Sequence, residues 1–258
     1  MRLRIVPARA GVQWARAGMR TFWRQPLALT GLFFMLFFAI SVVALVPLAG
    51  VVLTQMLMPA AGVGFMAAAE QVEAGRFPLP AVLIAGLRRG GARAMLLLGA
   101  LHAASMALLV AISALIDGGR FAWLYASGQE LTFRLMERAD SRAAFVVAAL
   151  LSLPVSILFW HAAALVHWYG VPPLKGLFFS AVAAFKNIRA FLLYGAAWLL
   201  MSFAAGLLLM MLALAAGTPM IADIGLGPVL LLMAAMLLTS LWFTFRDSFA
   251  ADDPPPAL

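Results

Sequence analysis

The feature that most constrains the fold is a run of 45 consecutive residues without a charged side chain, from Gln25 to Ala69. A spanning helix needs about 20 apolar residues, because a rise of 1.5 Å per residue must cross about 30 Å of hydrocarbon. The run therefore suits two such helices, joined by a tight turn near Pro47 and Gly50. In the whole chain 65% of residues are hydrophobic and 11% are charged, against about 45–50% and about 25% in a soluble domain. A water-soluble enzyme is excluded, and a polytopic membrane protein is predicted.

Four further charge-free stretches suit one helix each, and their bounds are Arg93 and Asp117, Arg142 and Lys175, Arg189 and Asp223, and Asp223 and Arg246. The predicted fold is all-α, a single transmembrane domain over residues 1–248 with spans at about 27–46, 50–69, 94–116, 145–168, 190–215 and 227–245. Residues 249–258, which include three consecutive prolines, are predicted to be a disordered tail. Continuous apolar runs differ from the alternating strands of an outer-membrane barrel, so a multi-pass protein of the bacterial inner membrane is expected.

Basic residues are distributed unevenly among the loops. If the N-terminus is cytoplasmic, the inner segments hold 14 of the 18 Arg and Lys residues, whereas acidic residues divide equally between the two sides. Short cytoplasmic loops carry an excess of Lys and Arg. Both termini are therefore predicted to face the cytoplasm.

Two segments beside the spans are amphipathic. Residues 9–24 combine a polar stripe with an apolar one, namely Arg9, Gln13, Arg16, Arg20 and Arg24 against Val12, Ala15, Met19, Phe22 and Trp23. Residues 174–185 carry an apolar stripe of Leu174, Leu177, Phe178, Ala181, Val182 and Phe185. A helix of this pattern lies in the interface, with its apolar face in the membrane and its basic face toward the head groups. A flank that only anchors the next span has the same pattern.

The net charge of +8 comes from basic residues that lie next to apolar runs. Anionic lipid head groups are therefore the expected partner, rather than nucleic acid. The candidate head-group contacts are Arg16, Arg20, Arg24, Arg88, Arg89, Arg93, Lys186 and Arg189.

The sequence contains a candidate threefold repeat, in which each unit pairs an interfacial helix with a span that leaves the cytoplasmic side and a span that returns. Residues 93–100 (RAMLLLGA) and 189–196 (RAFLLYGA) are identical at six of eight positions. The first unit matches the second more weakly, at Arg20 with Arg88 and Gly31 with Gly99. Units that all run the same way are parallel repeats, unlike the inverted repeats of many ion-coupled transporters.

The segment 117–142 is the only sizeable extramembrane piece and is expected to contain a short helix around Glu130, Arg134 and Arg138. It is either a solvated connector or a docking surface for a partner.

No Asp, Glu, Lys or Arg falls inside a predicted span, which argues against proton pumps, ion-coupled carriers and intramembrane proteases. The candidate intramembrane polar site consists of Gln55, His102 and His161. The two histidines are each nine residues from the inner end of their span, so they lie at similar depth. Structural hydrogen bonding, a ligand contact and a haem or metal site all remain open for this pair.

Other features predict packing. Pro59 and Pro154 are expected to kink their helices. Small residues let spans approach closely, and they are Ala60, Gly64 and Ala68 in the second span and Gly99 and Ala103 in the third. The chain has no Cys and no HExxH, GxSxG, P-loop or paired-carboxylate pattern. No catalytic, cofactor or metal site is predicted, and the protein is not expected to be an enzyme.

Several short motifs resemble a betaproteobacterial family of hypothetical six-helix inner-membrane proteins. They are Trp23-Arg24-Gln25-Pro26-Leu27-Ala28, Glu73-Ala74-Gly75-Arg76-Phe77-Pro78, Asp117-Gly118-Gly119 and Pro173-Leu174-Lys175-Gly176. The resemblance covers nearly the whole chain and implies a fold and a location but no activity. More distantly, the unit of interfacial helix plus span is similar to the membrane domain of some bacterial glycerophosphodiester phosphodiesterases, none of whose catalytic residues is present.

Three functions follow as hypotheses. The first is a non-enzymatic bundle that supports or regulates a partner protein or organises lipid, with a membrane-protein partner or a homo-oligomer as its assembly. The second is a transporter or channel for a small apolar or zwitterionic solute, which would use Gln55, His102 and His161. The third is a membrane enzyme or haem protein built on the two histidines.

Overall fold

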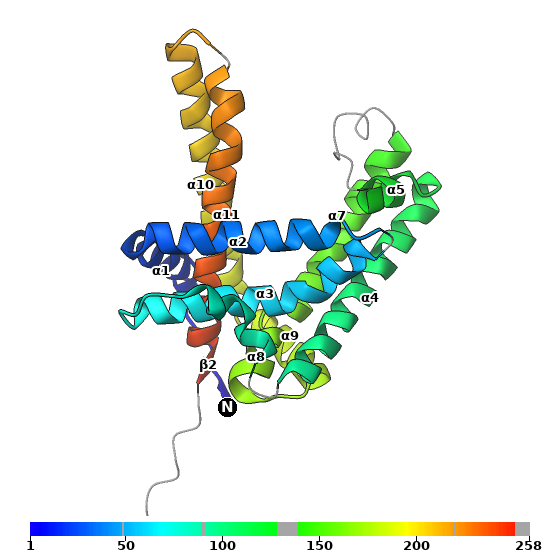
Figure 1. The fold of residues 1–258 in the computed structure, drawn as a ribbon, viewed down its shortest axis with the longest axis vertical. Coiled ribbons are helices and arrows are strands. Elements are labelled where there is room, and N and C mark those ends of the chain that lie inside the picture. The colour runs from blue at the N-terminus through cyan, green and yellow to red at the C-terminus, as the bar shows by residue number, and fades with distance from the viewer. Residues whose placement is uncertain (48, 89–90, 128–138, 219, 251–258) are drawn as a thin grey trace, which may run out of the picture. The chain divides into compact units, whose positions relative to one another are not determined.

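The structure is a computed structural model that describes all residues except 48, 89–90, 128–138, 219 and 251–258. The described chain is helical apart from two short strands (Figure 1). The elements in chain order are β1 (Arg2–Leu3), α1 (Ala10–Arg24), α2 (Pro26–Ala44), α3 (Gly50–Glu73), the 3-10 helix η1 (Pro80–Leu87), α4 (Ala92–Asp117), α5 (Arg120–Ser127), α7 (Ala139–Phe159), α8 (Ala162–Tyr169), α9 (Pro173–Lys186), α10 (Ile188–Ala215), α11 (Met220–Ser248) and β2 (Phe249–Ala250).

Six helical stretches are long and apolar enough to cross a membrane, which confirms the predicted all-α class and the number of candidate spans. They are Pro26–Ala44, Gly50–Glu73, Ala92–Asp117, Ala139–Tyr169, Ile188–Ala215 and Asp223–Ser248. Several helices are longer than the predicted spans. The spans were drawn over uncharged residues only, whereas α3 continues to Glu73 and α4 continues to Asp117.

The fourth predicted span, 145–168, is interrupted in the structure. Pro154 lies inside α7, which ends at Phe159, and α8 begins at Ala162. The turn between them is held by a side chain from α9, described below.

The chain forms two compact units. Unit 1 contains Met1–Phe37, Ala61–Ala85 and Val182–Leu258, and unit 2 contains Phe38–Ala60 and Gly86–Ala181. Helices α2, α3, η1 and α9 each contribute to both units.

In unit 1, α1 packs against α10 and α11. A Cβ at Gly11 would collide with the backbone of Ala190 in α10, and a Cβ at Gly18 would collide with Ser240 in α11. The indole ring of Trp14 contacts Phe191, with the ring centroids 5.4 Å apart. The amphipathic pattern predicted that the apolar face of this helix lies in the membrane. The structure instead buries much of that side against two spans, because the glycines let the backbones approach closely.

Within unit 1, hydrogen bonds attach the N-terminal segment to strand β2 and to Asn187. Strand β1 pairs antiparallel with β2, so Arg2 lies opposite Ala250. The buried amide of Asn187 accepts a hydrogen bond from the Val6 N–H (2.9 Å) and donates one to the Arg4 carbonyl (3.0 Å). The predicted tail at 249–258 therefore began two residues too early, because Phe249 and Ala250 find a strand partner 247 residues earlier in the chain. Residues 251–258 of that tail lie outside the described residues.

In unit 2, α4 packs along α7, with α5 against both. The buried core between them consists of Leu109, Phe121, Ala144 and Ala148. The buried Asp117 carboxylate accepts hydrogen bonds from the N–H groups of Gly119 and Phe121, which holds the first turn of α5. The short helix predicted around Glu130, Arg134 and Arg138 lies outside the described residues.

Candidate functional site

The structure brings together two of the three predicted intramembrane polar residues, Gln55 and His102, within unit 2. The Nδ1–H of His102 donates to the backbone carbonyl of Gln55, 2.9 Å away. The imidazole also packs edge-on against Phe159, with the ring centroids 4.9 Å apart. Helices α3 and α4 are close together near this contact. A Cβ at Gly99 of α4 would collide with the carbonyl of Met56 in α3. The side chain of His102 in α4 is therefore hydrogen-bonded to the main chain of α3.

His161 lies at the turn between α7 and α8 and is fully buried. Its backbone N–H donates to the Ser180 hydroxyl (3.0 Å), and that hydroxyl donates to the Ile157 carbonyl (2.9 Å). In a continuous helix the N–H of His161 would pair directly with the carbonyl of Ile157, four residues earlier. The Ser180 side chain is inserted into that hydrogen bond, which is a recognised cause of a helix break.

The two histidines thus have different surroundings: the imidazole of His102 contacts Gln55 and Phe159, and the main chain of His161 contacts Ser180 of α9. Within the part of the chain that the structure describes, no three His, Cys, Asp or Glu side chains lie close enough to hold a metal ion. The geometry favours hydrogen bonding between helices as the role of the His102 side chain, whereas the bond from His161 to Ser180 is made by the main chain.

A groove of about 570 Å³ lies beside Gln55 in unit 2. It runs from the end of α2, at Ala44, past the start of α3 at Gly50 to the middle of α4. Most of its wall is aliphatic, and Ala107 and Val110 line its α4 side. Such a wall suits an apolar occupant.

The predicted head-group contacts are exposed wherever the structure describes them, and they are Arg16, Arg20, Arg24, Arg88, Arg93, Lys186 and Arg189. Arg89 lies outside the described residues. On α1 the exposed residues form one stripe, whereas Trp14 and Phe22 are buried on the docked side.

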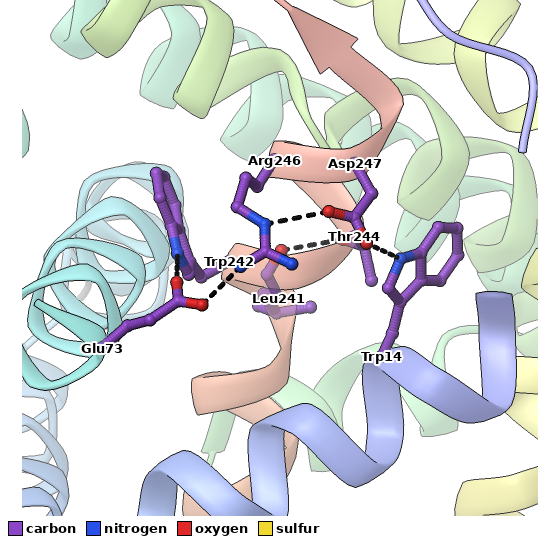
Figure 2. A network of polar contacts seen from close by, with 7 residues as sticks. All are labelled: Trp14, Glu73, Leu241, Trp242, Thr244, Arg246 and Asp247. Carbon is purple, nitrogen blue, oxygen red and sulfur yellow. Dashed lines mark hydrogen bonds and ion pairs between the residues drawn. The ribbon is translucent and has the colours of Figure 1, made fainter.

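Sequence reasoning missed a polar cluster in unit 1 that connects α1, α3 and α11 (Figure 2). The Glu73 carboxylate is paired with the Arg246 guanidinium and accepts a hydrogen bond from the Trp242 indole N–H, 2.9 Å away. Asp247 accepts hydrogen bonds from the Arg246 Nε (2.9 Å) and from the Trp14 indole N–H (2.9 Å). The guanidinium of Arg246 also lies over the ring of Phe243 on the same helix, 4.9 Å from its centroid.

This cluster had one signal in the sequence. Glu73 follows the second predicted span and Arg246 follows the sixth, so both fall on the predicted cytoplasmic side with opposite charges. Their separation of 173 residues gave no further reason to pair them. The cluster connects the ends of α3 and α11 to each other and to Trp14 of α1, and its geometry is that of a structural clamp.

Over 98% of its length the chain is 38% identical to the protein described as "Probable inner membrane protein BTH_II0599" of Burkholderia thailandensis, of which it covers 96%. No family model and no solved structure matches the chain.

Proposed function

The chain belongs to the same family as this probable inner-membrane protein of Burkholderia thailandensis, and we propose that it is a non-enzymatic helical bundle that organises anionic lipid around itself or around a partner membrane protein. It is an inner-membrane protein with six candidate transmembrane helices. The resemblance to a family of six-helix inner-membrane proteins is confirmed by this relative. The relative's description names a location and no activity, so the proposal depends on the surface of the chain itself.

The observation that carries the proposal is the two-sided structure of α1. One side, with Gly11, Trp14 and Gly18, is buried against α10 and α11. The opposite side exposes Arg16, Arg20 and Arg24 at intervals of one turn, and the helix contains no acidic residue. Each basic residue near an anionic membrane surface contributes about 1 kcal/mol. A docked helix presents these charges in a fixed row, which favours lipid binding over a purely local anchor.

We propose that this surface lies at the cytoplasmic leaflet with both termini inside, and the excess of Arg and Lys in the inner segments supports this orientation. The pairing of β1 with β2 supports a common side for the two termini, since it joins residues 2–3 to residues 249–250. We interpret the six spans as three parallel pairs, each preceded by an interfacial segment: α1, the region of η1, and α9. The match of residues 93–100 with 189–196 supports this interpretation.

The experiment compares two double variants of the full chain, R16Q/R20Q on α1 and R120Q/R142Q near the predicted outer ends of α5 and α7. Each removes two exposed cations. Lipids that co-purify from the bacterial membrane are quantified by mass spectrometry. Loss of two contacts of about 1 kcal/mol each is expected to lower the enrichment of anionic over zwitterionic phospholipid by more than about tenfold in R16Q/R20Q only. Equal enrichment in both variants would show that the α1 stripe has no such role.

The groove beside Gln55 favours a second candidate function, transport of a small apolar or zwitterionic solute. Ala107 lines the groove on α4, so A107W would fill it. Under this alternative, flux into proteoliposomes disappears in A107W and is unaffected by R16Q/R20Q. Under the leading proposal no saturable flux is found in the wild-type protein.

A further inference from the structure

A second cavity, of about 340 Å³, lies in unit 2 at the start of α4 and has a different character from the groove. Its volume falls in the range of small-molecule pockets, about 300–1,000 Å³. Its walls come from the end of η1, the first turn of α4 and the end of α8, and the residues that matter below are Gly86, Arg88, Gly91, His167 and Gly170.

The cavity is electropositive. Arg88 is exposed and lines it together with the partly buried imidazole of His167. Unit 2 contains no Asp or Glu in residues 86–116 or 141–181, because its acidic residues all fall between 117 and 140. The same end of the unit adds the exposed Arg93. An anion is therefore the complementary ligand.

The cavity also exposes main chain. Gly86, Gly91 and Gly170 form parts of the wall that carry no side chain. Gly91 immediately precedes α4, and no side chain caps that helix. The positive end of a 26-residue helix adds to the attraction exerted by Arg88.

Neighbouring residues indicate the depth of the cavity in the membrane. Trp168 and Tyr169 directly follow His167 at the end of α8, and this pair of residue types is typical of the membrane–water boundary. On α4 the next exposed side chains are Leu96 and Leu97, which suit hydrocarbon. These side chains suit a cavity at the level where a head group meets its acyl chains.

From these observations we propose that the cavity binds the phosphate of an anionic membrane phospholipid, with Arg88 as its charged ligand and the lipid tails running along Leu96 and Leu97. The proposed site rests on the proposed function, because that function brings anionic lipid to this end of α4. It adds a discrete site of one lipid to the diffuse attraction of the α1 stripe.

The test is native mass spectrometry of the full-length chain in detergent, titrated with phosphatidylglycerol or phosphatidylcholine. One phosphatidylglycerol is expected to remain bound to the wild-type protein. R88Q removes a charge-assisted contact and is expected to lower the affinity for that lipid by about tenfold. G91L fills the cavity, and it should fold because Gly91 has φ −82° and its nearest neighbouring atom would be 3.8 Å from a new Cβ. R120Q removes a cation at the other end of α4 and is the matched control.

Wild-type affinity in both R88Q and G91L would overturn the proposal, as would displacement of the lipid by inorganic phosphate at equal affinity, which would indicate a free-phosphate site. Failure of the α1 stripe is separate. If R16Q/R20Q keeps its enrichment of anionic lipid while R88Q and G91L lose the single bound lipid, the pocket stands and the proposed role of α1 falls. If the single lipid persists in R88Q and G91L while R16Q/R20Q loses enrichment, the reverse holds.

Discussion

Helices α1 and α9 have similar amphipathic patterns in the sequence but use their large side chains in opposite ways. In α1 the aromatic residues Trp14 and Phe22 are 1% and 0% exposed. In α9 Phe178 and Phe185 are 62% and 65% exposed, and the buried positions are taken by small or polar residues such as Ser180. In water a large exposed aromatic face would be unstable. In a membrane protein, lipid is a second apolar solvent, so an apolar stripe shows that a helix has two sides without showing which one meets protein.

The largest expected difference in stability is between variants of a buried phenylalanine of α1, Phe22, and an exposed one of α9, Phe178. F22A removes a side chain with 0% exposure from the contact region of α1 and is expected to lower the free energy of unfolding by about 3–5 kcal/mol. F178A removes an exposed ring and is expected to change it by less than about 0.5 kcal/mol in detergent. Thermal unfolding of the two purified variants measures both. Similar losses would mean that α9 has its aromatic face against protein, and the contrast between the helices would fail.

Glycines provide the next comparison, within unit 1. G18A places a methyl group against the backbone and Cβ of Ser240 in α11, a type of overpacking that costs about 1–3 kcal/mol. G195A is its control, because no atom lies within 4 Å of a new Cβ on α10 and alanine favours the helix. We expect a lower melting temperature for G18A and an equal or higher one for G195A. Destabilisation by G195A would show that the exposed side of α10 is covered by another chain.

The same glycines show how far the repeat can be followed. Gly99 and Gly195 occupy equivalent positions in the two best-matching segments. A Cβ at Gly99 would collide with Met56 in unit 2, whereas Gly195 faces open space. The repeat remains a prediction, and its equivalent positions pack differently.

The six candidate spans could be predicted because they depend on local composition: twenty apolar residues without a charge suffice, wherever the neighbours lie. The docking of α1 could not, because Gly11 and Gly18 matter only through residues of α10 and α11 that are over 170 positions away. The break after Phe159 was missed for the same reason. At the break the hydroxyl of Ser180 takes the place of the direct bond between Ile157 and His161, and no local pattern around Pro154 reveals this contact.

That hydroxyl gives a smaller expected effect. S180A removes the group inserted between the Ile157 carbonyl and the His161 N–H, both of which need a partner inside the protein. The cost is expected at the lower end of about 1–3 kcal/mol, because the two freed groups can pair with each other as in an uninterrupted helix. S152A is the control, since Ser152 bonds only within its own helix, to the Ala149 carbonyl. Amide exchange of the 157–161 segment should change in S180A and stay constant in S152A; no change in either variant would contradict the insertion.

The smallest effect is expected at the polar end of the docked face of α1, where Asp247 receives the Trp14 indole and Arg246 reaches Glu73 (Figure 2). E73Q keeps an acceptor for the Trp242 indole while removing the charge. The side chains of Arg246 and Glu73 are 41% and 33% exposed, and ion pairs with this much solvent contact contribute about 0–1 kcal/mol.

A double-mutant cycle of E73Q and R246Q isolates the pair from the indole contact. The coupling energy is expected to stay below about 1 kcal/mol and to fall as salt is added, because solvent ions screen exposed charges. A coupling above about 2 kcal/mol that does not respond to salt would require these groups to be shielded from solvent in the membrane. In that case the ends of α3 and α11 that carry the pair would be as closed to solvent as the buried aromatic side of α1. A weak, salt-sensitive coupling means instead that this ion pair between α3 and α11 adds little beside the buried Trp14 and Phe22 of α1, the large aromatic contacts that α9 lacks.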